Sequence, residues 1–200
     1  MIRAERSGNV LTLILDRPDK ANSLTAGMLE NLAQAVEGAD AGFLILTGGG
    51  DKVFSAGADL EEAKEGLATS PLWERLSGAV AAFPGLSIAA LNGTLAGGAF
   101  GMALACDLRL AVPTASFFYP VAKLGFLPQP SDPGRLAALV GPARAKLILC
   151  AGARLDAAEA LAFGLVDRVV PDARVAASEM VAGEPSHVAA IKAMVRVRGT

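Results

Sequence analysis

The chain has little of the chemistry that most hydrolytic or metal sites use. It contains one histidine, His187, and two cysteines, Cys106 and Cys150, among 200 residues. A Ser-His-Asp or Cys-His site would need His187, yet that residue lies beside Pro185 in a predicted C-terminal helix, and the chain has no Gly-x-Ser-x-Gly turn. One histidine and two distant thiols also exclude a zinc site. We expect both thiols to be buried in a reducing compartment, without a disulfide.

Charged residues are scarce as well, at 19% of the chain, and the two signs nearly balance to a net charge of −2. The sequence therefore has no basic stripe of the kind that binds a nucleic-acid backbone. Hydrophobic residues make up 52%. A surface with so little charge predicts that a partner chain covers part of it, so we expect a homo-oligomer.

No segment matches a membrane or export signal. The N-terminus lacks the basic, apolar and small-residue pattern of a signal peptide, which predicts a cytoplasmic protein. Residues 76–106 carry no charge, but Pro84-Gly85 and Asn92-Gly93 divide them into pieces shorter than the ~20 residues of a membrane helix. We expect this stretch to be a buried part of the core.

Segments typical of strands alternate with segments of helical periodicity. The predicted strands are residues 10–15, 43–46, 86–91, 108–112 and 166–170. A helix is expected from an N-cap at Thr25 to Gly38, and others over 58–66, 71–82, 97–106 and, as two or three helices, 134–163. This order predicts an α/β fold with right-handed βαβ crossovers and a mostly parallel sheet. We divide the chain into a core, residues 1–171, and a short helical tail, residues 172–200.

Two turns of small residues each follow a predicted strand and open a predicted helix. They are residues 54–60, Phe-Ser-Ala-Gly-Ala-Asp-Leu, and residues 92–99, Asn-Gly-Thr-Leu-Ala-Gly-Gly-Ala. The first amides of a helix have no intrahelical partner, so two such turns aimed at one point would stabilise an oxyanion on a carbonyl. Alternatively, the glycines only allow a buried helix to pack closely on the sheet. Neither these turns nor residues 48–52 match a nucleotide-binding motif well.

Taken together, several segments resemble the crotonase superfamily, also called the enoyl-CoA hydratase/isomerase family. They are residues 15–24 (Leu-Asp-Arg-Pro-Asp-Lys-Ala-Asn-Ser-Leu), both small-residue turns, 106–109 (Cys-Asp-Leu-Arg) and 164–167 (Gly-Leu-Val-Asp). The resemblance runs from about Val10 to Pro171. It implies a ClpP/crotonase-like fold of repeated ββα and βαβ units, with a shortened C-terminal helical region. It also implies an acyl-CoA substrate, no cofactor beyond the coenzyme A of that substrate, and a homotrimer or a dimer of trimers.

The resemblance carries over to particular residues. It implies that the backbone amides of Ala58 and Gly98 form an oxyanion hole. Lys20, Ala21, Asn22 and the backbone at Ala56 would lie near the adenine and pantetheine. Lys20 or Lys64 would meet a phosphate of coenzyme A or lie in solvent. The other residues expected to contact the substrate are Asp59, Leu60, Gly97 and Val121. Near the C-terminus, Lys192, Arg196 and Arg198 would reach a neighbour's coenzyme A or complement their own helix dipole.

Two positions depart from the family pattern. Gly101 and Val121 stand where hydratases of this family have two catalytic glutamates, so we expect the two-carboxylate hydration route to be lost. Tyr119 could donate a hydrogen bond to the substrate or be a core residue. Asp132, in a polar segment with Gln129 and Ser131, could act in the site or cap a helix.

These departures leave the reaction open. The main prediction is an enzyme that forms a thioester enolate in the oxyanion hole. One alternative is decarboxylation of a malonyl-type thioester, which needs no base because loss of CO₂ generates the enolate, with Val121 as an apolar wall. Another is a non-catalytic protein that binds acyl-CoA.

Overall fold

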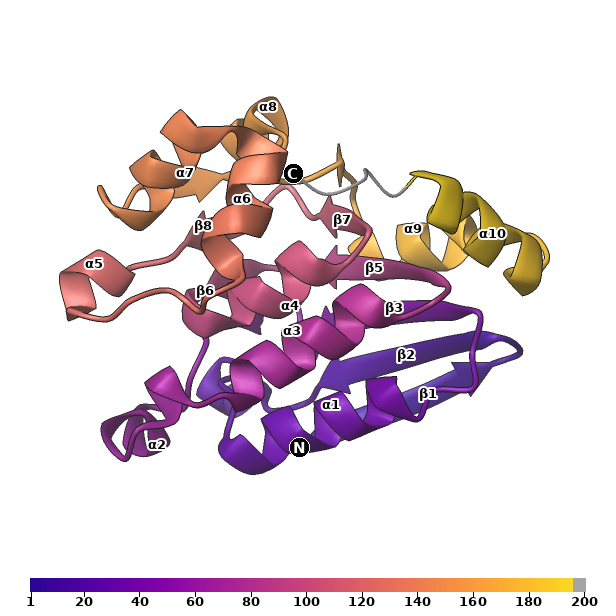
Figure 1. Cartoon of the computed structure of the whole chain (residues 1–200), viewed down its shortest axis with the longest axis horizontal. Helices are drawn as coiled ribbons and strands as arrows, with labels where there is room; N and C mark the ends of the chain where they lie inside the picture. Colours follow the sequence, from indigo (N-terminus) through magenta and orange to yellow (C-terminus); the bar gives the residue numbers. More distant parts are fainter. Residues whose placement is uncertain (196–200) are drawn as a thin grey trace.

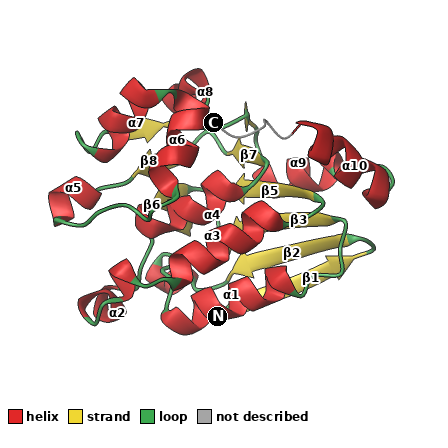
Figure 2. Ribbon diagram, in the orientation of Figure 1, coloured by secondary structure: helices red, strands yellow, loops and turns green. Residues whose placement is uncertain are grey.

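The computed structural model describes residues 1–195, and its strands form two sheets (Figures 1 and 2). The larger sheet has six strands in the order β1-β2-β3-β5-β7-β10, and only the pair β1 and β2 is antiparallel. Its strands are β1 (Ile2–Ser7), β2 (Val10–Leu15), β3 (Phe43–Gly48), β5 (Leu86–Leu91), β7 (Leu108–Ala111) and β10 (Arg168–Val169). The predicted mostly parallel α/β architecture is confirmed.

The smaller sheet has four strands in the order β4-β6-β8-β9. Strands β4 (Val53–Ser55), β6 (Thr94–Ala96) and β8 (Ser116–Phe118) are parallel neighbours, and β9 (Arg154–Asp156) is antiparallel to β8. The sequence did not predict this sheet, because strands of three residues are too short to show a period of two. Three parallel neighbours end at the same edge, and this edge carries the site described below.

Helices cover both faces of the larger sheet. On one face α1 (Ala26–Glu37) and α3 (Leu72–Ala82) pack together, with α4 (Phe100–Ala105) beside α3 (Figure 1). Helix α1 begins as predicted, since the Thr25 side chain accepts a hydrogen bond from the Met28 amide. Leu44 and Leu46 belong to the core on this face, whereas Ile45 packs on the other face against Ala173 and Ala177 of α9 (Ala173–Met180). Strand β3 is thus buried on both sides, which explains the continuous hydrophobic run at residues 43–46.

The remaining helices lie around the smaller sheet and at the C-terminus. They are α2 (Leu60–Lys64), α5 (Val121–Leu124), α6 (Asp132–Val140), α7 (Pro142–Leu149), α8 (Ala157–Phe163) and α10 (Pro185–Val195), with 3₁₀ turns at Pro18–Lys20, Leu67–Thr69 and Gly97–Ala99. None of the helices in residues 1–195 is both long and apolar enough to cross a membrane.

The cysteines and the C-terminal segment test further expectations. Cys106 is buried as predicted, but Cys150 is exposed, so the expected burial was wrong for that thiol. Cys150 comes directly after the last residue of α7, at its solvent-facing end. His187 is exposed on α10. Lys192 pairs with Asp107 at 2.7 Å and donates to the Phe83 and Gly85 carbonyls, so its ammonium group binds within its own chain. Arg196 and Arg198 lie outside the described residues.

Candidate active site

The two small-residue turns meet at one edge of the smaller sheet. Strands β4 and β6 are parallel and paired, so the turn after each strand leaves the sheet in the same direction. Gly57 has φ +92° and Gly97 has φ +58°, conformations that favour glycine. A Cβ on Gly57 would lie 3.0 Å from the Ala96 carbonyl oxygen and 3.3 Å from the Gly98 nitrogen. The turns are therefore packed backbone to backbone.

Each turn presents a backbone amide without a protein acceptor. Within residues 1–195 the Ala58 amide donates no hydrogen bond, although the neighbouring Asp59 amide donates to the Leu24 carbonyl at 2.8 Å. Gly98 is the second residue of the 3₁₀ turn Gly97–Ala99, where no earlier carbonyl of the turn is available. The predicted oxyanion hole of Ala58 and Gly98 stays a prediction. Only backbone atoms are required, so the small side chains leave the approach open.

A buried network holds the first turn. The Asn22 side chain is fully buried, accepts from the Arg17 amide at 2.9 Å and donates to the Gly49 and Val53 carbonyls at 2.9 and 2.7 Å. The carbonyl of Ala21 accepts from the Ala56 amide at 3.0 Å. Ala21 and Asn22 both have positive φ, near 50°. The side chain of Asn22 thus positions the loop rather than lining the cavity, and its predicted contact with a substrate stays a prediction.

Asp59, expected to contact the substrate, has a structural role instead. Its Oδ1 accepts from the amides of Glu61 and Glu62 and so caps α2. Its Oδ2 accepts from the Arg17 guanidinium at 2.7 Å, and this hydrogen bond lowers the pKa of the Asp59 carboxyl. The carboxylate is therefore fully engaged, and it does not line the cavity.

A cavity of about 170 Å³ lies over the two turns. Its lining is apolar except for backbone atoms, Tyr119 and Gln129. Predicted residues that line it are Ala56, Ala58, Leu60, Gly97, Gly98, Tyr119 and Val121, and unpredicted ones include Ala63, Ala68, Trp73, Phe118, Leu124 and Phe126. Trp73 forms one wall, since its ring carbons lie 3.2 to 3.3 Å from where a Cβ on Gly98 would be. Trp73 was not predicted to line the cavity. That it is the only tryptophan of the chain is the one feature of the sequence that singles it out.

The cavity ends at a buried tyrosine–carboxylate pair. Tyr119 follows β8, the third parallel strand at this edge, and its hydroxyl donates to Asp132 Oδ2 at 2.8 Å. Asp132 is fully buried. Burial raises the pKa of the Asp132 carboxyl to about 6, and burial together with the Asp132 charge raises the pKa of Tyr119 further above its ordinary value. Asp132 is the first residue of α6, whose N-cap is Ser131, so the alternative of a capping role for Asp132 was wrong.

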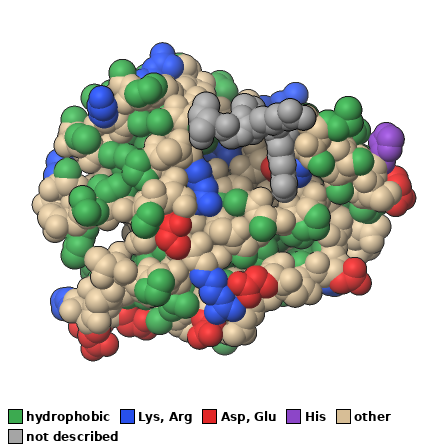
Figure 3. Space-filling view, viewed as in Figure 1, with side chains coloured by type: hydrophobic (Ala, Val, Ile, Leu, Met, Phe, Trp, Pro, Cys, Tyr) green, Lys and Arg blue, Asp and Glu red, His purple; other side chains and the backbone are tan. Residues whose placement is uncertain are grey.

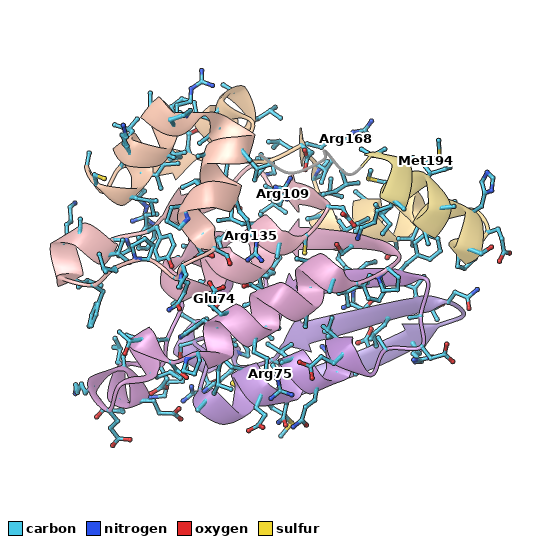
Figure 4. All side chains as sticks on the ribbon, viewed as in Figure 1. Glu74, Arg75, Arg109, Arg135, Arg168 and Met194 are labelled. Atoms are coloured by element: carbon cyan, nitrogen blue, oxygen red, sulfur yellow. The ribbon has the colours of Figure 1, made fainter. Side chains whose placement is uncertain are left out.

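Two charged residues lie behind the Tyr119–Asp132 pair, Glu74 on α3 and Arg135 on α6. Glu74 accepts from the Ser131 amide at 3.0 Å and from its hydroxyl at 2.6 Å. Arg135 lies beside Glu74 (Figure 4). Within residues 1–195, Arg135 Nη1 and Asp132 Oδ1 are buried without a hydrogen-bond partner. Neither Glu74 nor Arg135 was predicted from the sequence, because their meeting depends on how α3 packs against the start of α6.

The predicted coenzyme A lysines lie outside the cavity. Lys20 is exposed at the end of a 3₁₀ turn, and Lys64 pairs with Glu61 at 3.1 Å on the surface of α2. Within residues 1–195, no three His, Cys, Asp or Glu side chains converge as metal ligands.

Comparison with known proteins agrees with this geometry. The sequence model of the enoyl-CoA hydratase/isomerase family matches residues 5–198. The chain belongs to this family. Carnitinyl-CoA dehydratases from Citrobacter koseri and Salmonella enteritidis are 37% and 39% identical over 210 aligned residues, which cover 96% of this chain and 78% of each relative. The crotonase superfamily expected from the sequence is confirmed.

Solved structures share the fold. DspI of Pseudomonas aeruginosa is 33% identical with a TM-score of 0.86, covering 98% of this chain and 86% of that chain. An enoyl-CoA hydratase from Bacillus anthracis is 33% identical with a TM-score of 0.84, covering 98% and 82%. The crotonase fold predicted from the short motifs is therefore correct.

Proposed function

We propose that this family member is an enzyme that acts on an acyl-CoA thioester. The amides of Ala58 and Gly98 bind the thioester oxygen and stabilise the enolate that forms on it. One observation carries the proposal, namely two backbone amides without acceptors among residues 1–195, on turns that follow paired parallel strands beside an apolar cavity. The names of the carnitinyl-CoA dehydratases and the enoyl-CoA hydratase support a coenzyme A thioester.

The coenzyme A end of the substrate is assigned to the outside of the first turn. Lys20 and the backbone of Ala21 and Ala56 border this side, and the Lys20 ammonium is exposed and free to meet a phosphate as a mobile point charge. The acyl end lies toward Trp73 and Val121, where the walls are apolar. No separate cofactor takes part in this proposal.

The lining of the cavity favours decarboxylation of a malonyl-type thioester as a second candidate. Among the described residues, none with a charged side chain lines the cavity, and Val121 stands where a hydratase of this family has a glutamate. An apolar wall desolvates a substrate carboxylate, and loss of CO₂ forms the enolate without a base. Hydration through two carboxylates is not supported by this lining.

Mass spectrometry on a panel of thioesters tests both candidates. The protein is incubated with crotonyl-, 3-enoyl-, 3-hydroxyacyl-, malonyl- and methylmalonyl-CoA, with Gly98→Pro as the variant that lacks one amide. Gain or loss of water, loss of CO₂, or a new retention time at unchanged mass identifies the reaction. If malonyl- and methylmalonyl-CoA lose no CO₂, the decarboxylase is wrong. Binding without any turnover would make the protein an acyl-CoA-binding module instead.

A further inference from the structure

We propose that the Tyr119 hydroxyl donates the proton that quenches the thioester enolate and that Asp132, behind it, supplies the next proton. This relay rests on the proposed function, because it needs an enolate in the oxyanion hole. The relay gives the site a proton donor, although Gly101 and Val121 stand at the two positions where hydratases of this family have glutamates.

Tyr119 is placed to connect the cavity with the interior. Its ring lines the cavity and stacks on Phe100, with centroids 5.2 Å apart and planes at 21°. Its hydroxyl donates to Asp132 Oδ2 at 2.8 Å and accepts from the Gln129 backbone amide at 3.5 Å. The tyrosine follows β8, next to the strand that leads to Gly98. The backbone at Tyr119 therefore leaves the smaller sheet at the same edge as the turn that carries Gly98.

Asp132 is held where a carboxyl group can be neutral. Its side chain is fully buried, and within residues 1–195 its Oδ1 has no hydrogen-bond partner. A Cβ on Gly101 would lie 2.9 Å from this oxygen, so α4 faces the carboxyl group with backbone only. Glu74 on α3 disfavours the charged form, whereas Arg135 on α6 and the hydrogen bond from Tyr119 favour it. Burial outweighs the effects of Tyr119 and Arg135 and raises the pKa of Asp132 to about 6.

Protonation of Asp132 reverses the hydrogen bond. The charged carboxylate can only accept, so the single Tyr119 proton points away from the cavity and toward Oδ2. A protonated Asp132 donates to the Tyr119 oxygen instead, and the tyrosine proton is then free to turn toward the cavity. The pair has two states that differ in where this proton points.

The proton transfer balances within the pair. The enolate carbon takes the Tyr119 proton, so a C–H bond forms while the phenolic O–H bond breaks. The phenolic oxygen takes the Asp132 proton at the same time, which leaves a neutral tyrosine and a carboxylate. The electron pair of the enolate becomes the new C–H bond, and the thioester carbonyl is restored. Water returns a proton to Asp132 before the next turnover.

Nuclear magnetic resonance can test the reversal without any substrate. Tyr119 is the only tyrosine of the chain, so ring-labelled [4-¹³C]tyrosine gives one signal from the full-length protein. We expect this signal to move between pH 5 and pH 8 with a midpoint near 6, and to stay fixed in Asp132→Asn. Asp40→Asn, which changes an exposed aspartate on the loop after α1, is the matched control and should titrate like the wild type. A fixed wild-type signal would overturn the relay.

Kinetics then test the catalytic role, with malonyl-CoA as the probe and 3-enoyl-CoA if malonyl-CoA is not consumed. We expect kcat of the wild type to fall as the pH rises above 6. Tyr119→Phe should lower kcat about 10²-fold or more, with KM nearly unchanged. Asp132→Asn should lower kcat at least about tenfold and remove its pH dependence.

The outcomes separate the relay from the proposed function. Turnover that is independent of pH, or is kept within threefold in Tyr119→Phe, overturns the relay while the proposed enzyme stands. If the wild type binds the thioesters of the panel but consumes none of the five, the proposed enzyme and the catalytic role of the pair are both wrong. A titrating tyrosine signal would then report only the hydrogen-bond reversal.

Discussion

The Asp132 carboxylate occupies the space that a side chain at position 101 would need. A Cβ on Gly101 would lie 2.9 Å from Asp132 Oδ1, closer than real Cβ atoms come to a neighbour. The two positions are 31 residues apart and come from α4 and α6. Glycine on one helix and a buried carboxylate on the other therefore form one arrangement, in which the carboxylate of α6 fills the space beside the backbone of α4.

This arrangement predicts coupling between the two positions. Gly101→Ala should lower the free energy of unfolding by about 1–3 kcal/mol, because its new methyl group meets Asp132. In an Asp132→Ala background the carboxylate is gone, and the same change should be neutral or stabilising, since alanine favours a helix. Urea unfolding of the four proteins gives the coupling energy, which should exceed about 1 kcal/mol. Additive effects would show that the close approach is not real.

Asp132 also predicts how stability depends on pH. The folded protein holds its proton up to about pH 6, whereas the unfolded chain releases it near the ordinary pKa of 3.8. The folded state then binds more protons over this interval, so the free energy of unfolding falls as the pH rises from about 4 to 6. Asp132→Asn removes this loss. It should be more stable than the wild type at pH 8 by up to about 3 kcal/mol, with the difference vanishing near pH 4.

Denaturant curves of both proteins from pH 4 to 8 provide the measurement. Asp40→Asn serves as the control, because Asp40 is exposed. A constant difference between wild type and Asp132→Asn at all pH values would contradict the assignment.

Removal of the Gly98 amide should lower the turnover of the thioester without a loss of coenzyme A binding. Gly98→Pro removes the N–H, and kcat for the thioester that the wild type consumes should fall about 10²–10³-fold. Gly98→Ala keeps the N–H and adds a methyl group 3.2 Å from the Trp73 ring, so it controls for crowding. We expect that variant to keep most of its kcat. Equal losses in the two variants would assign the effect to packing, and calorimetry with coenzyme A checks that binding survives.

The expected homotrimer or dimer of trimers stays a prediction, and exposed hydrophobic side chains offer a surface on which to test it. Leu124 and Leu127 are 63% and 85% exposed, and hydrophobic side chains gather on the side that carries α5 and α7 (Figure 3). Sedimentation equilibrium should give three or six times the chain mass of 20.3 kDa. Leu127→Glu should lower that mass if this surface lies between subunits. A wild-type monomer at micromolar concentration would contradict the expectation.

The sequence predicted the elements whose hydrophobic pattern is long enough to read. Helix α1 with its Thr25 cap and the strands β2, β3 and β5 lie where expected. The small residues of the two turns led to the proposal of the Ala58 and Gly98 amides as an oxyanion hole, because glycine and alanine let the backbone approach a ligand closely. The antiparallel strand β1 and the whole smaller sheet were not predicted, although that sheet is what aligns the turns.

The division between sequence and tertiary structure follows from the range of the interactions. By itself the sequence determined the family, the parallel α/β core and the two turns, since each depends on residues within a few positions of one another. Only the tertiary structure decided that Tyr119 meets Asp132, that Asp132 fills the space beside Gly101, and that Glu74 and Arg135 stand behind them. These contacts join three helices and a loop, and a carboxyl pKa near 6 exists only where that packing removes water.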